Sequence, residues 1–161
     1  VSIAIINGGA LRASIDAGQI TMGDVLTVLP FQNTLATFQL SGAHLLKALE
    51  NGVSKVAQGA GRFPQVAGLS FSFDMAQPPG KRISNVFVTA ANGKRHPLVA
   101  DQIYGIASNN YLRAGRDGYD IFAKNALNAY DFGPGLDQVV TDYLAKTGTY
   151  KPYADGRISA Q

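Results

Sequence analysis

The stretch Gly23–Glu50 reads GDVLTVLPFQNTLATFQLSGAHLLKALE and carries the strongest structural signals of the chain. It predicts a strand over Leu35–Leu40, followed at once by Ser41, whose hydroxyl can cap the start of a helix. A strand that leads directly into an amphipathic helix predicts that the helix packs on a sheet. Within this helix apolar residues recur at the helical spacing, at Leu45, Leu49, Val53 and Val56.

The segment before this stretch predicts one more strand and one more helix. The β-branched run Val1–Ile6 indicates a short buried strand, which Asn7-Gly8-Gly9 ends. Thr21 and Asp24 have the spacing of a capping box, so a short helix is expected over Met22–Val28, ending before Pro30.

The segment after it alternates short strands, turns and helices without a regular order. Such an order favours an α+β fold, a mixed β-sheet with packed helices, over a doubly wound parallel sheet. We find no internal repeat and no linker, which predicts a single layered domain over residues 1–161. The expected strands are Leu69–Asp74, Ile83–Thr89, His96–Val99 after a tight turn at Asn92-Gly93, and Gln102–Ala107, and the expected helices are Tyr119–Lys124 and Leu136–Ala145.

Composition narrows the class of protein. The chain has 161 residues, of which 46% are hydrophobic and 16% charged, values typical of a globular domain. Its net charge of +3 suits an anionic small molecule, whereas its scattered basic residues do not form the concentrated patch of a nucleic-acid-binding protein. No apolar run reaches the length of a membrane helix. Because the chain opens VSIAII, without an initiator methionine or a signal-peptide pattern, we expect it to be cut from a longer polypeptide.

Signals of catalysis and of metal binding are missing. The chain has no cysteine, which excludes disulfides and thiolate sites, and its two histidines, His44 and His96, are far in sequence from each other and from any carboxylate. There is no G-x-S-x-G elbow, phosphate-binding loop or dinucleotide fingerprint. We therefore expect no catalytic residues, no metal and no cofactor within this chain.

Residues suited to binding instead lie on glycine-rich loops, and each has an alternative structural explanation. The turn INGGALR offers Asn7 and Arg12, but it could be a plain structural turn. The aromatic rings of Phe31 and Tyr111 could belong to the core. Asp117 in NNYLRAGRDGYDIF could cap the helix that begins near it.

Taken together, these residues describe one kind of ligand. Two aromatic rings on separate loops can clamp a flat base by its faces. A carboxylate can accept hydrogen bonds from two adjacent ribose hydroxyls, and an arginine can bind an anionic group. A ring, a diol and an anion make up a nucleotide.

Four stretches, in this order, resemble the C-terminal domain of the 5′-nucleotidases, a family that includes UDP-sugar hydrolases and 2′,3′-cyclic-nucleotide phosphodiesterases. They are INGGALR, the stretch Gly23–Glu50, GRFPQVAGLSFSFD and NNYLRAGRDGYDIF, and the ending DGRIS also fits. The resemblance spans nearly the whole chain, from Ile3 to Ser159.

The resemblance implies a two-domain, metal-dependent hydrolase that releases phosphate from nucleotides. An N-terminal metallophosphatase domain, absent from this chain, would hold two divalent metal ions, and the C-terminal domain would bind the nucleoside. A rotation between the domains would bring the phosphate to the metals. In this chain the matching substrate-binding residues are Phe31 and Tyr111 for the base, Asn33 for a base contact, Asp117 for the ribose, Asn7 and Gly9 for the nucleoside, and Arg12 for the phosphate.

Two departures from the family pattern qualify these expectations. The second aromatic of the clamp, commonly phenylalanine, is Tyr111, whose hydroxyl needs a hydrogen-bond partner in the protein or a water molecule. The family also has an arginine upstream of the point where this chain starts, so one contact to the anion is expected to be missing. Because the metallophosphatase domain is absent as well, the fragment should bind nucleotide but not hydrolyse it. The resemblance implies a periplasmic or extracellular parent, with the missing domain as partner. The composition predicts neither nucleic-acid binding nor a membrane segment. The alternative is a non-catalytic binding or docking module that retains the fold.

Overall fold

The computed structural model describes all 161 residues and contains two β-sheets. The larger sheet mixes parallel and antiparallel pairs: β1 runs parallel to β7, whereas β1–β3, β2–β7 and β2–β8 are antiparallel. Its strands, in spatial order, are β3 (Pro64–Ala67), β1 (Ile3–Asn7), β7 (Ile103–Asn109), β2 (Leu35–Ser41) and β8 (Leu127–Tyr130).

The second sheet has four strands and is also mixed. The strand β4 pairs antiparallel with β5 and parallel with β9, and β5 pairs antiparallel with β6. The order is β6 (Arg95–Pro97), β5 (Ile83–Thr89), β4 (Leu69–Phe73) and β9 (Ile158–Ala160). The predicted α+β fold with mixed sheets is therefore confirmed.

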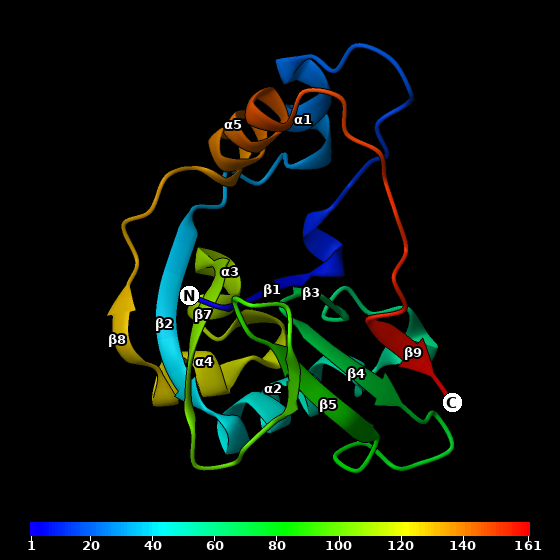
Figure 1. Cartoon of the computed structure of the whole chain (residues 1–161), viewed down its shortest axis with the longest axis vertical. Helices are drawn as coiled ribbons and strands as arrows, with labels where there is room; N and C mark the ends of the chain where they lie inside the picture. The colour runs from blue at the N-terminus through cyan, green and yellow to red at the C-terminus, as the bar shows by residue number, and fades with distance from the viewer.

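Five α-helices accompany the sheets. In Figure 1, α1 and α5 lie together at the top of the molecule, and α2 lies in the lower half, between β2 and β5 in this view. None of the helices is long and apolar enough to cross a membrane. Their bounds are α1 (Met22–Val28), α2 (Gly42–Val53), α3 (Asn110–Arg113), α4 (Asp120–Asn125) and α5 (Leu136–Thr147), and single 3₁₀ turns lie at Gly8–Ala10, Val56–Gln58 and Arg116–Gly118.

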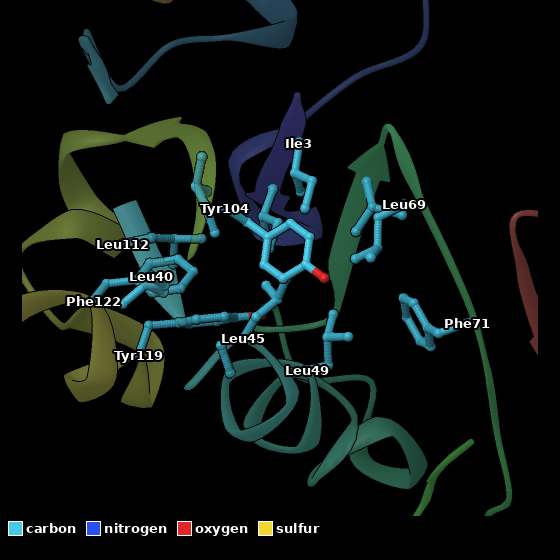
Figure 2. Close-up of a cluster of buried hydrophobic side chains, with 14 of the residues drawn as sticks. Ile3, Leu40, Leu45, Leu49, Leu69, Phe71, Tyr104, Leu112, Tyr119 and Phe122 are labelled. Atoms are coloured by element: carbon cyan, nitrogen blue, oxygen red, sulfur yellow. The ribbon is translucent and has the colours of Figure 1, made fainter. Parts of the chain in front are cut away.

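A single hydrophobic core joins both sheets to α2. Figure 2 shows Leu45 and Leu49 on the face of α2 that points toward the sheets, with Tyr104 and Leu69 nearby. Both leucines are almost fully buried, as their helical spacing predicts. The ring of Phe122 also belongs to this core, so the segment after β7 is anchored by its own aromatic side chain.

The predicted caps of the two N-terminal helices are present. The Thr21 hydroxyl accepts a hydrogen bond from the Asp24 backbone N–H, and the Asp24 carboxylate accepts one from the Thr21 N–H in return. The hydrogen bonds with Thr21 lower the pKa of Asp24. Ser41 caps α2 by accepting from the His44 N–H. Val56, expected in α2, lies instead in the following 3₁₀ turn, although it still packs against the core.

Several short elements escaped prediction. The strands β3, β8 and β9 were not expected: β3 begins with a proline, all four residues of β8 are exposed, and β9 has only three residues. None of these three segments combines β-branched residues with an alternation long enough to indicate a strand. The four-residue helix α3 was also missed, since one turn cannot display helical periodicity.

Two helical glycines provide a test of how tightly α2 is packed. A Cβ added to Gly52 would meet the Tyr119 hydroxyl and the Pro64 ring at 2.8 Å, whereas one added to Gly23 of α1 would find its nearest neighbour at 3.5 Å. We expect Gly52→Ala to lower the free energy of unfolding by about 1–3 kcal/mol through overpacking. Gly23→Ala, the matched control, should raise it by up to about 1 kcal/mol because alanine favours a helix. Urea denaturation of both variants measures this, and equal changes would contradict the packing of α2 on Tyr119.

Candidate functional site

The sheet topology gathers the predicted site residues at one edge of the larger sheet. Because β1 and β7 are parallel, their carboxyl ends, Asn7 and Asn109, lie at the same edge. The start of β2 joins them, since Leu35 pairs with Asn109 in the antiparallel register. The loops that carry the predicted residues all leave from these three strand ends.

The Asp117 carboxylate is held from two sides at this edge. Its Oδ2 accepts a hydrogen bond of 3.0 Å from Asn7 Nδ2, and its Oδ1 accepts one of 3.2 Å from the Tyr111 hydroxyl. The structure thus brings Asn7 to Asp117, 110 residues further along the chain, and to its near neighbour Tyr111. Asp117 is half-buried, and two hydrogen bonds leave its oxygens further lone pairs to accept from a ligand.

The backbone of Asp117 has the left-handed conformation, with φ at 56°. Its carbonyl oxygen accepts a hydrogen bond of 3.1 Å from Asn51 Nδ2 in α2, and Arg62 Nη1 donates in turn to Asn51 Oδ1 at 3.1 Å. The alternative that Asp117 caps a helix is wrong, because α4 begins after Tyr119 and has no side-chain cap. The fold therefore supports an unusual backbone conformation at this acid.

Tyr111 is exposed, and its hydroxyl has a protein partner. The residue is 41% exposed, which overturns core packing as its role. Desolvation, followed by the nearby charge of Asp117, raises the pKa of Tyr111, so the hydroxyl is protonated at neutral pH and donates to the carboxylate. Eight residues further along the chain, Tyr119 is buried, and this burial raises the pKa of its hydroxyl. The Tyr119 hydroxyl donates to the Arg62 carbonyl at 2.8 Å and so anchors the end of the loop that carries Asp117.

Phe31 also lies outside the core, on the loop that leads into β2. The residue is 57% exposed, so the alternative of core packing is wrong here too. The next residue, Gln32, has a left-handed φ of 53°, and the Asn33 carbonyl accepts a hydrogen bond of 2.8 Å from the Leu136 N–H at the start of α5.

The loops of Phe31 and Tyr111 are joined to each other directly. The Asn110 N–H donates to the Thr34 carbonyl at 3.0 Å, and the Thr34 N–H donates to Asn110 Oδ1 at 3.1 Å. Phe31 lies three residues before Thr34, and Tyr111 lies one residue after Asn110. This pair of hydrogen bonds therefore holds the loops of the two exposed aromatic residues side by side.

An open groove of about 460 Å³ lies beside the turn that follows β1. The guanidinium of Arg12 is exposed, and its Nη1 lies 3.4 Å from the Gly9 carbonyl. Gly9 also has a structural role, because a Cβ there would come within 3.0 Å of Gly61 Cα. The groove is lined by Gly8, Gly9, Arg12, Val56, Gly59, Ala60, Gly61 and Phe63.

The two histidines take no part in this site. His96 is exposed, and His44 lies half-buried on α2. Nowhere in the chain do three or more histidine, aspartate or glutamate side chains come together as a metal-binding group.

Sequence reasoning missed two asparagines, Asn109 and Asn51, and one arginine, Arg62, that hold the site. Asn109 is fully buried, and its Nδ2 donates to Asn7 Oδ1 at 3.0 Å. Asn51 and Arg62 support the Asp117 turn from α2 and from the loop before β3. The only signal in the sequence was the asparagine pair at the end of an apolar strand, where an amide must find partners if it is buried.

Comparisons with known proteins agree on the family. The sequence profile described as 5′-nucleotidase, C-terminal domain matches residues 1–124. The trifunctional nucleotide phosphoesterase YfkN of Bacillus subtilis is 43% identical over 97% of this chain, and human 5′-nucleotidase is 35% identical over 98% of it. The crystal structure of a 5′-nucleotidase precursor from Thermus thermophilus, 40% identical, superposes on 99% of the chain with a TM-score of 0.95. The chain spans 11%, 28% and 31% of the length of these three proteins, respectively.

Proposed function

The chain belongs to the 5′-nucleotidase C-terminal domain family, and we propose that it is the nucleotide-recognition domain of a larger, metal-dependent phosphohydrolase that releases phosphate from nucleotides. The relatives it matches are nucleotide phosphoesterases and 5′-nucleotidases, which supports a hydrolase as the parent. All of them extend well beyond the part that this chain covers.

The observation that supports the proposal is that two exposed aromatic residues and a held carboxylate lie on loops that leave from the same edge of the larger sheet. Phe31 and Tyr111 stand on joined loops, and Asp117 lies within hydrogen-bonding distance of the Tyr111 hydroxyl. In the proposed complex the two rings stack on the base and Asp117 accepts hydrogen bonds from the ribose diol. Asn7, Gly9 and Asn33 are the further nucleoside contacts of this proposal.

In the proposed complex the phosphate lies in the groove beside Gly9 and Gly61. Its one charged lining residue is Arg12, whose exposed guanidinium can turn from the Gly9 carbonyl to a phosphate oxygen. Glycines in the lining leave backbone close to the ligand without side chains in between.

The chemistry of bond cleavage is assigned to the rest of the parent protein. The side chains of this chain do not fit the two divalent metal ions that the family resemblance implies, because no three ligating residues come together. We therefore assign the metals to an N-terminal metallophosphatase domain, and we place the parent in the periplasm or outside the cell. The isolated chain is then a binding domain without hydrolase activity.

Isothermal titration calorimetry of the chain with adenosine, AMP, UMP and ribose 5-phosphate tests the proposal. We expect saturable binding of the nucleoside and both nucleotides, and weak or no binding of ribose 5-phosphate, which lacks a base to stack. Comparing AMP with UMP ranks the bases, and a UDP-sugar or a 2′,3′-cyclic nucleotide in the same assay ranks the phosphate esters. Equal binding of ribose 5-phosphate and AMP would contradict base recognition, and no binding by any ligand would favour a docking module.

A further inference from the structure

The two buried asparagines at the sheet edge form a one-way chain of hydrogen bonds. The Leu112 backbone N–H donates to Asn109 Oδ1 at 2.8 Å, and Asn109 Nδ2 donates to Asn7 Oδ1 at 3.0 Å. Asn7 Nδ2 then donates to Asp117 Oδ2 at 3.0 Å. The four groups come from β1, the end of β7, α3 and the turn before α4.

The direction of this chain is set at both ends. At one end a backbone N–H can only donate, so Asn109 must present its oxygen there. At the other end a carboxylate can only accept, so Asn7 must present its NH₂ group. Each of the two amides therefore accepts a hydrogen bond through its oxygen and donates the next one through its NH₂ group. Asn109 is fully buried and Asn7 is 5% exposed, so water does not compete for these groups.

Asn109 therefore connects the two proposed halves of the ligand site. As the N-cap of α3 it fixes the helix that carries Tyr111, and through Asn7 it fixes the carboxylate of Asp117. Resting on the function proposed above, we propose that Asn109 is a positioning residue that, acting through Asn7, orients the Asp117 carboxylate toward the ribose diol.

The substitution Asn109→Asp keeps the role of residue 109 as N-cap of α3 but removes its hydrogen bond to Asn7, the first step of the relay from Asn109 through Asn7 to Asp117. An aspartate still accepts from the Leu112 N–H, because aspartate caps helices as well as asparagine does. It cannot donate to Asn7, whose amide must then turn its NH₂ group toward residue 109 and its oxygen toward Asp117. An oxygen facing a carboxylate repels it, so Asp117 loses its fixed orientation.

Two further variants complete the design. Asn109→Ser keeps a capping oxygen but is too short to reach Asn7, and it breaks the relay without burying a charge, in case the aspartate variant does not fold. Asn92→Asp is the matched control: Asn92 is exposed in the turn before β6, and its Oδ1 accepts from the Lys94 N–H, a role that an aspartate keeps.

Binding of adenosine and of 2′,3′-dideoxyadenosine to these variants tests the proposal. We expect the Asn109 variants to bind adenosine about tenfold more weakly, from the loss of a hydrogen bond to a charged group, and to lose clearly less affinity for the dideoxy analogue, which has no diol for Asp117. Asn92→Asp should bind both like the parent. Equal losses for the two nucleosides would show a merely structural role for Asn109 and overturn the proposal, as would no loss for either.

A measurement without ligand separates this inference from the proposed function. Three-bond scalar couplings report the χ1 rotamer of Asp117, which should be single in the parent and averaged in both Asn109 variants. If the parent binds neither nucleoside, the proposed function fails, and the couplings still decide the positioning role. Unchanged couplings in the variants would refute that role whatever the binding data show.

Discussion

Replacing Phe31 with alanine is expected to weaken adenosine binding by about 5- to 150-fold, the range that corresponds to losing one base–aromatic stack of roughly 1–3 kcal/mol. Tyr111→Ala should weaken adenosine binding at least as much, because it also removes the hydrogen bond of 3.2 Å to Asp117. Each ring is substantially exposed, so neither substitution opens a cavity in the core, and stability should change little.

The control for this pair is Tyr143→Ala. Tyr143 lies on the second half of α5 and is 56% exposed, close to the 57% of Phe31. Calorimetric titration of the three variants gives the Kd of each for adenosine. The control should bind like the parent, and a clamp is contradicted if Phe31→Ala and Tyr143→Ala bind equally well.

The second large effect is expected at Asp117. Asp117→Asn keeps an oxygen for Asn7 Nδ2, and asparagine tolerates the left-handed φ of 56°. It removes the negative charge and turns one acceptor oxygen into an NH₂ group. Because hydrogen bonds to a charged group contribute about 1.5–3 kcal/mol, adenosine should bind about 10- to 150-fold more weakly.

The selectivity of this loss identifies its cause. A nucleoside without the 2′ and 3′ hydroxyls has no diol for the carboxylate, so 2′,3′-dideoxyadenosine should bind the Asp117→Asn variant and the parent with nearly the same Kd. If the dideoxy analogue loses as much affinity as adenosine does, Asp117 supports the loop rather than the ribose.

The parts of the fold that could be predicted from sequence are those with a long enough pattern. The helix after Ser41 shows its apolar face over three turns, and the capping box at Thr21 and Asp24 marks a helix start by its spacing alone. The short strands β3, β8 and β9 show no such pattern. They form because neighbouring strands supply hydrogen-bond partners, which is a property of the tertiary structure.

The candidate site was predictable where the chemistry belongs to single exposed side chains. Phe31, Tyr111 and Asp117 could be chosen because aromatic and acidic residues on glycine-rich loops suggest a ligand. Asn109 could not be chosen in this way, because its role depends on the parallel pairing of β1 with β7. This pairing brings Asn7, 102 residues away in the sequence, within hydrogen-bonding distance of Asn109. The same pairing explains why Asp117 is held rather than free to cap α4.

Intermolecular NOEs in the adenosine-saturated chain test the central claim, that Phe31 and Tyr111 clamp the base, most directly. The account predicts contacts from the H2 and H8 protons of adenine to the rings of both residues, with upfield shifts of both base protons from the two ring currents. NOEs to neither ring, in a sample where adenosine is demonstrably bound, would contradict it and move the nucleoside site away from this edge of the sheet.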